Sequence, residues 1–598
     1  MRGRCDSSAP TGSRNRGRIP GPLITSAEAP PPKASSLALV VLVGLTVLSP
    51  WPFGSVTPLA VHLVTLVALT TSAVALAWAP AEGGLGVPAL PLLPVLGLLA
   101  LGLFQLLPLP AALHAALAPG SHAIWSPASP AAQAVLGGGP HPVSVHPAAT
   151  CRALLFGGGL VSLALLAAPA LARAGSAVLA AGLVVAGGVG VSTYGIVARG
   201  RFGSLLYGHI PVPTVSPFGP FVSKNHFAGY VGMAALLALG LAVGLARGGG
   251  RREWTSGRRA SGVVLALVAA LAMALGVLVS LSRGGAASLA AGVLAFLALR
   301  VRHRLGEGRL GPVLPSLAVA VALATLLLLV LPPHAHERLR SLAETSFRLD
   351  TWRDTLRTAA SSPLVGQGLG AFEDAYPRFK SGHGELRVEH AENDYLETLA
   401  EAGLLGLFFA VAALILSAAR VLAARPSSLL RDLGAGALAG LVALLTHSAF
   451  DFNLRIPSNA ILAAFLVSVA AAGAPVRLAA AWASRAAAAA FGLATLLALP
   501  RAGFPVDPSS PWEETRNEAR LAAASVAPEV RLLRLERTER ALLALLRSRP
   551  AHAEGWLLLA GRRAEGGDPS ASELARHAVA LDPERPDLRS AAEALLFP

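Results

Sequence analysis

The side chains best suited to acid–base chemistry lie in one short polar run, His390-Ala-Glu-Asn-Asp-Tyr-Leu-Glu397. Read as a helix, the run has a single polar stripe at i, i+3, i+4 and i+7 spacing, formed by His390, Asn393, Asp394 and Glu397. A stripe of this kind holds an imidazole beside a carboxylate that orients it, as a general base requires. We therefore predict His390 as a catalytic residue, and Asn393 and Asp394 as substrate-binding residues.

The same run has a second interpretation, a divalent metal site formed by His390, Glu392 and Asp394. The i, i+2 offset places Glu392 off the stripe, so we expect neither a metal nor another cofactor. The glycines of the segment 363–372 resemble a nucleotide loop only superficially, because no strand–turn–helix context and no Gly-Lys-Ser/Thr sequence follows. They predict a tight turn, which could expose backbone amides.

A single arginine interrupts two long apolar runs. Ser280-Leu-Ser-Arg-Gly-Gly285 joins these runs with almost no loop, so Arg283 is held close to hydrocarbon, where an unpaired guanidinium is costly. Its planar fork suits a pair of phosphate or pyrophosphate oxygens better than a lysine would. Alternatively, Arg283 snorkels from a helix end toward water. The two glycines that follow it disfavour this alternative, because they leave the arginine uncovered.

Two further polar clusters stand at the ends of apolar runs. Lys224, Asn225 and His226 precede one run, where a cation, an amide and an imidazole at a helix N-terminus could bind an anionic head group. Taken alone, they fit slightly better an interfacial cap in which Asn225 satisfies free amides and Lys224 snorkels. The segment 446–457 concentrates His, Asp, Asn and Arg, and is either a site or a mutually satisfied cap.

The elements that position these groups are membrane helices. The chain has 598 residues, of which 54% are hydrophobic and 14% charged, a balance that excludes a water-soluble domain of this size. Apolar runs near the roughly 20 residues needed to cross a bilayer predict about thirteen spans. They are 35–50, 57–79, 88–107, 153–171, 176–198, 226–246, 260–281, 284–300, 313–331, 401–420, 432–449, 458–473 and 478–499.

The charge pattern predicts how these spans are oriented. Arginines dominate the tail 1–34 and the loops near 247–259, 300–309 and 420–431, so these segments are expected on the cytoplasmic side. The polar segments around 199–225, 282–283, 332–400 and 447–457, and the chain after 500, then lie outside. Because the net charge of +15 is dispersed among apolar spans, nucleic acid is not an expected partner.

The chain is expected to divide into five parts. They are a basic cytoplasmic tail 1–34 that runs into an uncleaved first span, N-terminal membrane helices 35–200, a membrane core 201–473 with a large outer loop 332–400, a last membrane helix 474–500, and an outer helical domain 501–598. Trp556 and the 33-residue spacing of Arg549-Pro550 and Asp582-Pro583 fit a tetratricopeptide-like unit, which would dock a protein partner; a capping hairpin is the alternative. Two cysteines, Cys5 and Cys151, provide no disulfide framework.

Several of these motifs together resemble the O-antigen ligase and polymerase superfamily. They are Arg283 in its Ser-Arg-Gly turn, Arg348 with Trp352, the segment 363–372, and His390 to Tyr395 followed by Glu401-Ala-Gly-Leu-Leu-Gly406. The resemblance covers residues 200–470, and its most specific part is the pattern His-x-x-Asn-Asp-Tyr-Leu. Glu392 within this pattern and the helical tail depart from the family and leave the acceptor open.

The resemblance implies a lipid-linked glycosyltransferase of lipopolysaccharide or other cell-surface polysaccharide synthesis. Such enzymes move a glycan from undecaprenyl pyrophosphate to an acceptor on the periplasmic face of the bacterial inner membrane, without metal or nucleotide. By position, His390 would deprotonate the acceptor hydroxyl, with inversion, while Arg283 and Arg348 would stabilise the departing pyrophosphate. The acceptor would be lipid A-core, a growing polymer or a protein, so ligase and polymerase both fit.

Two other classes of protein compete with this interpretation. A solute or anion transporter also has many spans with polar residues, but it would carry them near mid-bilayer in paired halves, and the sequence has no internal repeat. An assembly scaffold would explain the helical tail, but neither Arg283 nor His390.

Overall fold

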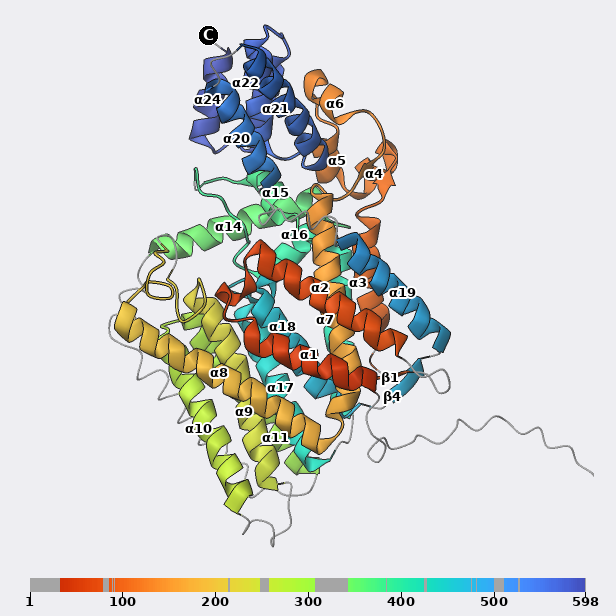
Figure 1. Ribbon diagram of the computed structural model, residues 1–598, viewed down its shortest axis with the longest axis vertical. Helices are drawn as coiled ribbons and strands as arrows, with labels where there is room; N and C mark the ends of the chain where they lie inside the picture. The colour runs from red at the N-terminus through yellow and green to blue at the C-terminus, as the bar shows by residue number, and fades with distance from the viewer. Residues whose placement is uncertain are drawn as a thin grey trace, which may run out of the picture. The chain divides into compact units, whose positions relative to one another are not determined.

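The chain forms an all-α membrane protein, in a computed structural model that describes most of its length (Figure 1). The described residues are 33–78, 85–88, 90, 92–212, 216–247, 257–306, 342–382, 384–423, 427–474, 476–479, 481–498, 510–524 and 528–596. Its strands are short: β1 (Leu85–Pro88) pairs antiparallel with β4 (Val476–Ala479), and β2 (Pro108–Leu109) with β3 (His141–Pro142). The predicted fold class, a polytopic helical bundle, is confirmed.

Eight helices of the described part are long and apolar enough to cross a membrane. They are α2 (Pro58–Ala77), α7 (Pro147–Leu171), α8 (Ala174–Phe202), α9 (Lys224–Arg247), α10 (Gly257–Val279), α11 (Arg283–Gly306), α16 (Asp394–Ala423) and α17 (Ser428–His447). Shorter apolar helices are α1 (Lys33–Leu48), α3 (Leu92–Phe104), α18 (Pro457–Ala471) and α19 (Ala481–Ala498). Each predicted span has its helix except 313–331, which lies outside the described residues.

Helix α9 is the centre of the bundle, buried along most of its length and packed against α8, α10, α11, α17 and α18. Small residues let its backbone approach α17 closely. A Cβ added at Gly240 would lie 2.8 Å from the Cα of Gly436, and one at Gly436 would lie 2.7 Å from the Cα of Gly240. Close approach of this kind is how helices associate in lipid, where apolar side chains gain little by leaving the solvent.

The two ends of this bundle differ in their charges. At one end Asp432 of α17 accepts from Arg247 of α9 at 3.3 Å and from Arg300 of α11 at 2.5 Å. Three basic segments that the charge pattern assigned to one side therefore meet at one end. The polar segments that begin α9, α11 and α16 and that follow α17 meet at the other end, which we call the site end.

The glycine-rich segment 363–372 packs against a kink in α16. Gly403 inside that helix has φ 64°, and a Cβ on it would lie 2.5 Å from the Leu364 backbone. The amides of Gln367 and Gly368 donate to Ala400 and Glu401 carbonyls at 3.1 and 2.9 Å. The predicted turn is present, but these amides are bonded to α16 and are not exposed for a ligand.

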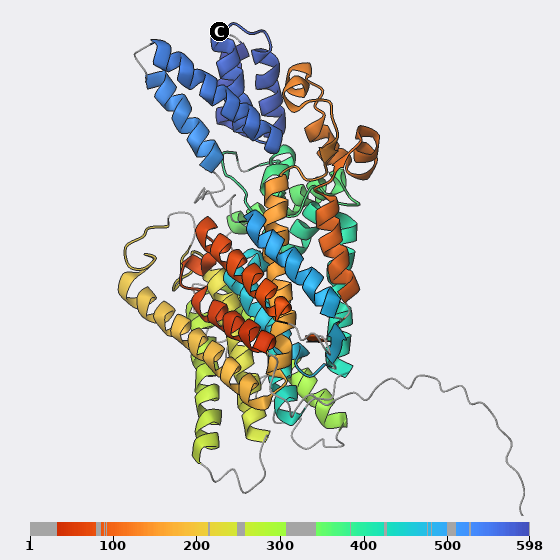
Figure 2. The ribbon, with the colours of Figure 1, turned by 45° about the vertical axis from the view of Figure 1, so that its right-hand side comes forward.

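A layer of shorter helices covers the site end (Figures 1 and 2). It contains α4 (Ala111–Leu117), α5 (Pro119–Trp125), α6 (Pro130–Leu136), α14 (Leu342–Ser361), α15 (Phe372–Ala375) and the 3-10 helix η2 (Pro377–Phe379). The C-terminal helices are α20 (Ser510–Ala524), α21 (Pro528–Ser548), α22 (Ala553–Glu565), α23 (Ala571–Leu581) and α24 (Pro586–Leu596). Helices α22 and α23 form an antiparallel pair around Trp556; a tetratricopeptide unit remains a prediction.

The C-terminal helices share their core with the segment 108–146, where the sequence analysis predicted no individual helix or strand. Val135 and Leu136 of α6 belong to the same apolar cluster as Leu542 and Trp556. A buried ion pair adds to this contact, because Arg549 donates to Asp374 at 2.7 Å while His146 lies 2.6 Å from the same carboxylate. The C-terminal helices therefore pack on the segment that leads to His390.

Candidate functional site

His390 stands just before α16 and not on it. The helix begins at Asp394, so the prediction of one helical stripe from His390 to Glu397 is wrong. Asn393 ends the loop as an N-cap: its Oδ1 accepts from the amides of Tyr395 and Leu396 at 3.0 and 3.1 Å. An N-cap residue has a non-helical backbone, which explains why the helix cannot include the residues before it.

The pairing of His390 with a carboxylate is nevertheless made. Its Nδ1 lies 3.0 Å from Oε1 of Glu397, whose Oε2 accepts from the Ala391 amide at 2.9 Å. The imidazole also stacks on Phe452, with ring centroids 4.2 Å apart. With Nδ1–H donated to the carboxylate, Nε2 is the nitrogen left to accept a proton.

The electrostatic surroundings of His390 favour its protonated form. Burial lowers the pKa of His390, but the charge of Glu397 and the hydrogen bond to it raise the pKa by more. The net pKa therefore lies above its ordinary value of 6.5. A base of this kind accepts a proton readily, and it is free to do so once the pH rises above this raised pKa.

Arg455 is the cation that makes a cluster of buried carboxylates tolerable on α16. Its guanidinium lies 2.7 Å from Glu401, 3.4 Å from Glu397 and 3.9 Å from Asp394. Burial opposes the charge on Arg455, but the three carboxylates together raise its pKa. The Asp394 side chain also accepts from the Leu454 amide at 3.0 Å, which ties the segment 446–457 to the helix.

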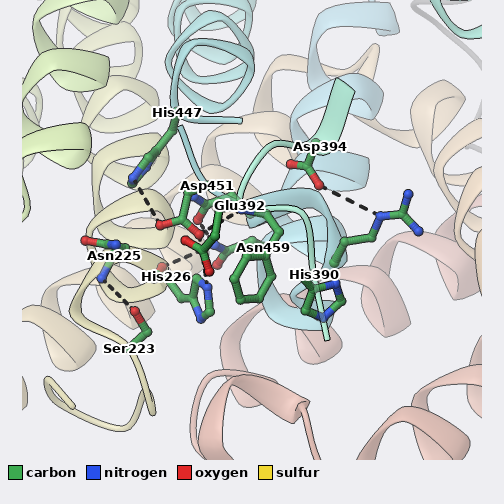
Figure 3. Close-up of polar contacts among 12 residues, drawn as sticks. Ser223, Asn225, His226, His390, Glu392, Asp394, His447, Asp451 and Asn459 are labelled. Carbon is green, nitrogen blue, oxygen red and sulfur yellow. Dashed lines mark hydrogen bonds and ion pairs between the residues drawn. The ribbon is translucent and has the colours of Figure 1, made fainter. Parts of the chain in front are cut away.

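A second cluster of titratable side chains surrounds Asp451 (Figure 3). Asp451 has His226 Nε2 3.3 Å from one oxygen and His447 Nε2 4.0 Å from the other. The His226 ring meets Phe452 edge to face at 4.7 Å. Burial raises the pKa of Asp451, but His226 first, then His447 and the Phe452 amide, lower it to about 2. The segment 446–457 thus combines an internal cap around Arg455 with an acid–base cluster around Asp451.

Arg348 and Glu392 lie beside these two clusters. The Arg348 guanidinium of α14 is 3.6 Å from Glu392, and their side chains are 39% and 24% exposed, so both are within reach of a ligand. Burial and the nearby charge of Asp451 raise the pKa of Glu392 to about 7, against the effect of Arg348 and His390. Arg348 is therefore held by a carboxylate that is only partly ionised at neutral pH.

The turn before α11 closes the same site end. Ser282 Oγ donates to Asn225 Oδ1 at 2.8 Å, which joins the beginnings of α9 and α11. A Cβ at Gly284 would lie 2.9 Å from His447 Nε2, so this turn touches the Asp451 cluster. Arg283 is exposed, and its guanidinium forms no ion pair within the described part of the chain. Lys224, partly buried, is the first residue of α9.

The structure thus brings the predicted site residues to one end of the bundle from four segments far apart in sequence. It also shows that Asn393 and Asp394 hold local structure, that Asn225 bonds to the turn, and that His226 contacts a carboxylate. The sequence analysis did not identify Phe452, which separates the two imidazoles, or Asn459, whose amide donates to the His226 carbonyl at 3.1 Å. Among the described residues, no three His, Cys, Asp or Glu side chains form a metal-binding group.

The middle of the chain matches the model of a known protein family. Residues 268–411 match the family model described as O-Antigen ligase. The matched segment contains Arg283, Arg348, His390 and Glu397, whereas the Asp451 cluster lies outside it, with His226 before the segment and His447 and Asp451 after it. No curated protein matches the chain.

Proposed function

Because residues 268–411 match the O-Antigen ligase family model, we propose that the chain transfers a glycan from undecaprenyl pyrophosphate to an acceptor hydroxyl. The observation that carries the proposal is the contact between His390 Nδ1 and Glu397, inside the matched segment and beside Arg348. An imidazole oriented by a buried carboxylate is suited to deprotonate a hydroxyl. The reaction belongs to cell-surface polysaccharide synthesis.

In the proposed step, Nε2 of His390 takes the proton of the acceptor hydroxyl. The hydroxyl oxygen then forms the new bond to the anomeric carbon, and the bond from that carbon to the pyrophosphate oxygen breaks. The electron pair leaves with undecaprenyl pyrophosphate, and the configuration of the sugar inverts because attack and departure occur on opposite faces. Glu397 stabilises the imidazolium that forms, through its contact of 3.0 Å.

Arg283 and Arg348 bind the pyrophosphate and stabilise the charge that grows on it as it leaves. Pyrophosphate is already a good leaving group, so electrostatic stabilisation is the assistance it needs most. Lys224 adds a third cation at the beginning of α9, where the helix dipole also favours an anion. Asn225, His226, Asn393 and Asp394 act in this proposal by fixing the turns around the substrate.

We place this chemistry on the periplasmic face of the inner membrane. The support is the separation of charges in the bundle: the basic segments around Asp432 meet at the end opposite the site. Arginines beside membrane spans stay preferentially in the cytoplasm. The C-terminal helices, which pack on the layer that covers the site end, are then periplasmic as well.

The test is the glycolipid profile of a deletion strain complemented with the wild type or with His390→Ala, at matched membrane abundance. The matched control is His209→Ala, since His209 is exposed on the 203–212 loop and contacts the Tyr207 carbonyl. Glycan that stays on the carrier with His390→Ala supports a ligase, and single repeat units on the acceptor support a polymerase. A normal profile with His390→Ala would overturn the proposal and favour a transporter or a scaffold.

A further inference from the structure

A groove of about 460 Å³ lies between the C-terminal helices and the segment that joins α5 to α6. Its walls come from three segments distant in sequence. Ala123 and Pro127 line it from the α5 side, Arg378 from η2, and Arg576 and His577 from α23. A space of this size accommodates a ligand of one to two sugar rings, since small-molecule sites hold roughly 300–1,000 Å³.

The charges that line the groove are predominantly positive. Arg378 and Arg576 both reach it, and no carboxylate pairs with either guanidinium within the described part of the chain. The polar contact found for Arg576 is weak, from its Nη2 to Ser572 Oγ at 3.4 Å. Glu573 also lines the groove, but its carboxylate accepts from Ser129 Oγ and the Ala131 amide, both at 3.2 Å.

His577 forms part of the wall of the groove. Its Nε2 is buried and has no hydrogen-bond partner among the described residues. Its ring meets Trp556 edge to face at 4.8 Å, which fixes the imidazole in the wall. Burial, and then the charge of Arg378, lower the pKa of His577 to about 4. The imidazole is therefore neutral at physiological pH, and the positive charge of the groove comes from Arg378 and Arg576.

We propose that this groove binds an anionic sugar unit of the glycan that the enzyme handles. Two guanidinium groups suit a carboxylate or phosphate substituent, because their planar forks match pairs of anionic oxygens. The Ala and Pro side chains pack against the apolar faces of the ring. Asp374 and Arg549, which are buried, pair with each other, whereas the two arginines of the groove remain accessible to a ligand.

The groove is linked to the catalytic loop through the chain itself. Arg378 lies on η2, twelve residues before His390, and Lys380 between them pairs with Asp582 of the C-terminal helices at 3.1 Å. A glycan held at Arg378 would extend along the segment that carries the proposed base. This inference rests on the proposed function for the nature of the ligand, but its test does not require turnover.

The test measures binding to the full-length protein in lipid nanodiscs by isothermal titration. The probe is tetragalacturonate, and its fully methyl-esterified form is the neutral control. We expect the ester to bind at least about tenfold more weakly, and Arg378→Gln/Arg576→Gln to weaken tetragalacturonate binding by about tenfold or more, since hydrogen bonds to charged groups are the stronger ones. Arg531→Gln, on an exposed arginine of α21, should bind as the wild type does.

Arg576→Glu alone is the second variant, because Arg576 is exposed and its reversal leaves the core intact. It should weaken binding too. Equal binding of acid and ester, an unchanged affinity in the variants, no binding of tetragalacturonate, or equally tight binding of inorganic phosphate alone would each overturn the inference. His390→Ala should keep the tetragalacturonate affinity and lose transfer. Retained transfer in that variant would refute the proposed function and leave the groove standing.

Discussion

Replacing Glu397 by Gln tests the proposed base without removing it. The carboxylate accepts from Nδ1 of His390 at 3.0 Å, which leaves Nε2 unprotonated. An amide can present its NH₂ group instead, and then favours the tautomer in which Nε2 carries the proton and cannot act as a base. Because general base catalysis contributes typically 10²–10⁴-fold, we expect the single-turnover rate to fall by a factor in about that range.

The same variant should change how the rate depends on pH. In the wild type the carboxylate raises the pKa of His390 above 6.5, so the neutral base becomes available only as pH rises through this raised value. Without the carboxylate the pKa falls, and the ascending limb of the rate profile should move to lower pH. A purely structural role for Glu397 would lower the amount of active enzyme without moving this limb.

The assay is single-turnover transfer from a purified lipid-linked donor, with enzyme in excess, across a pH series. Glu385→Gln is the matched control, since Glu385 is an exposed carboxylate on the same loop. A Glu397→Gln variant whose rate stays within about threefold of the wild type, with an unmoved pH profile, would refute the assignment of His390 and Glu397 as a base and its orienting partner.

Two further perturbations concern the elements around the base. Arg549→Met leaves the buried Asp374 carboxylate without its arginine, which should lower the free energy of unfolding by about 3–5 kcal/mol and increase hydrogen exchange in residues 372–390. The double variant Asp374→Asn/Arg549→Met should restore much of the protection from exchange. Equal exchange in all three proteins would contradict the prediction. The pKa of Glu392 in the folded protein is raised to about 7 from 4.5, so the folded protein binds more protons than the unfolded chain between about pH 5 and pH 8. Stability therefore falls as the pH rises through this window. Glu392→Gln should reduce this loss of thermal stability. Parallel Tm–pH curves for wild type and variant would contradict it.

Much of the bundle could be predicted because the signal for a membrane helix is local. A run of apolar residues in lipid must form its backbone hydrogen bonds within itself, as a helix does. The composition of about 20 residues is therefore enough to predict a membrane helix. The helices α4 to α6 escaped prediction for the opposite reason. They have seven residues each, and Val135 and Leu136 find their apolar partners some 400 residues later, on α21 and α22.

The site was predictable in its residue types and not in its geometry. The sequence indicated that His390 and Glu397 lie together, and they do, but across a helix start and not along a helix. The capping signal was present, since Asn393 followed by Asp394 is typical of a helix N-terminus. Contacts such as Arg455 with Glu401, or Asp451 with His226, join segments 54 and 225 residues apart and follow only from the packed fold.

In the proposed mechanism, Arg348 would connect binding of the donor to the protonation of Glu392. In the structure it faces Glu392, a carboxyl whose pKa of about 7 reflects burial and the charge of Asp451. A pyrophosphate that approaches Arg348 competes with this carboxylate and repels it, which favours its protonation. Binding of the donor would then draw Arg348 away from Glu392, and release of the pyrophosphate would restore the pair. In this proposal the ion pair would keep the Arg348 guanidinium oriented until a pyrophosphate displaces the Glu392 carboxylate.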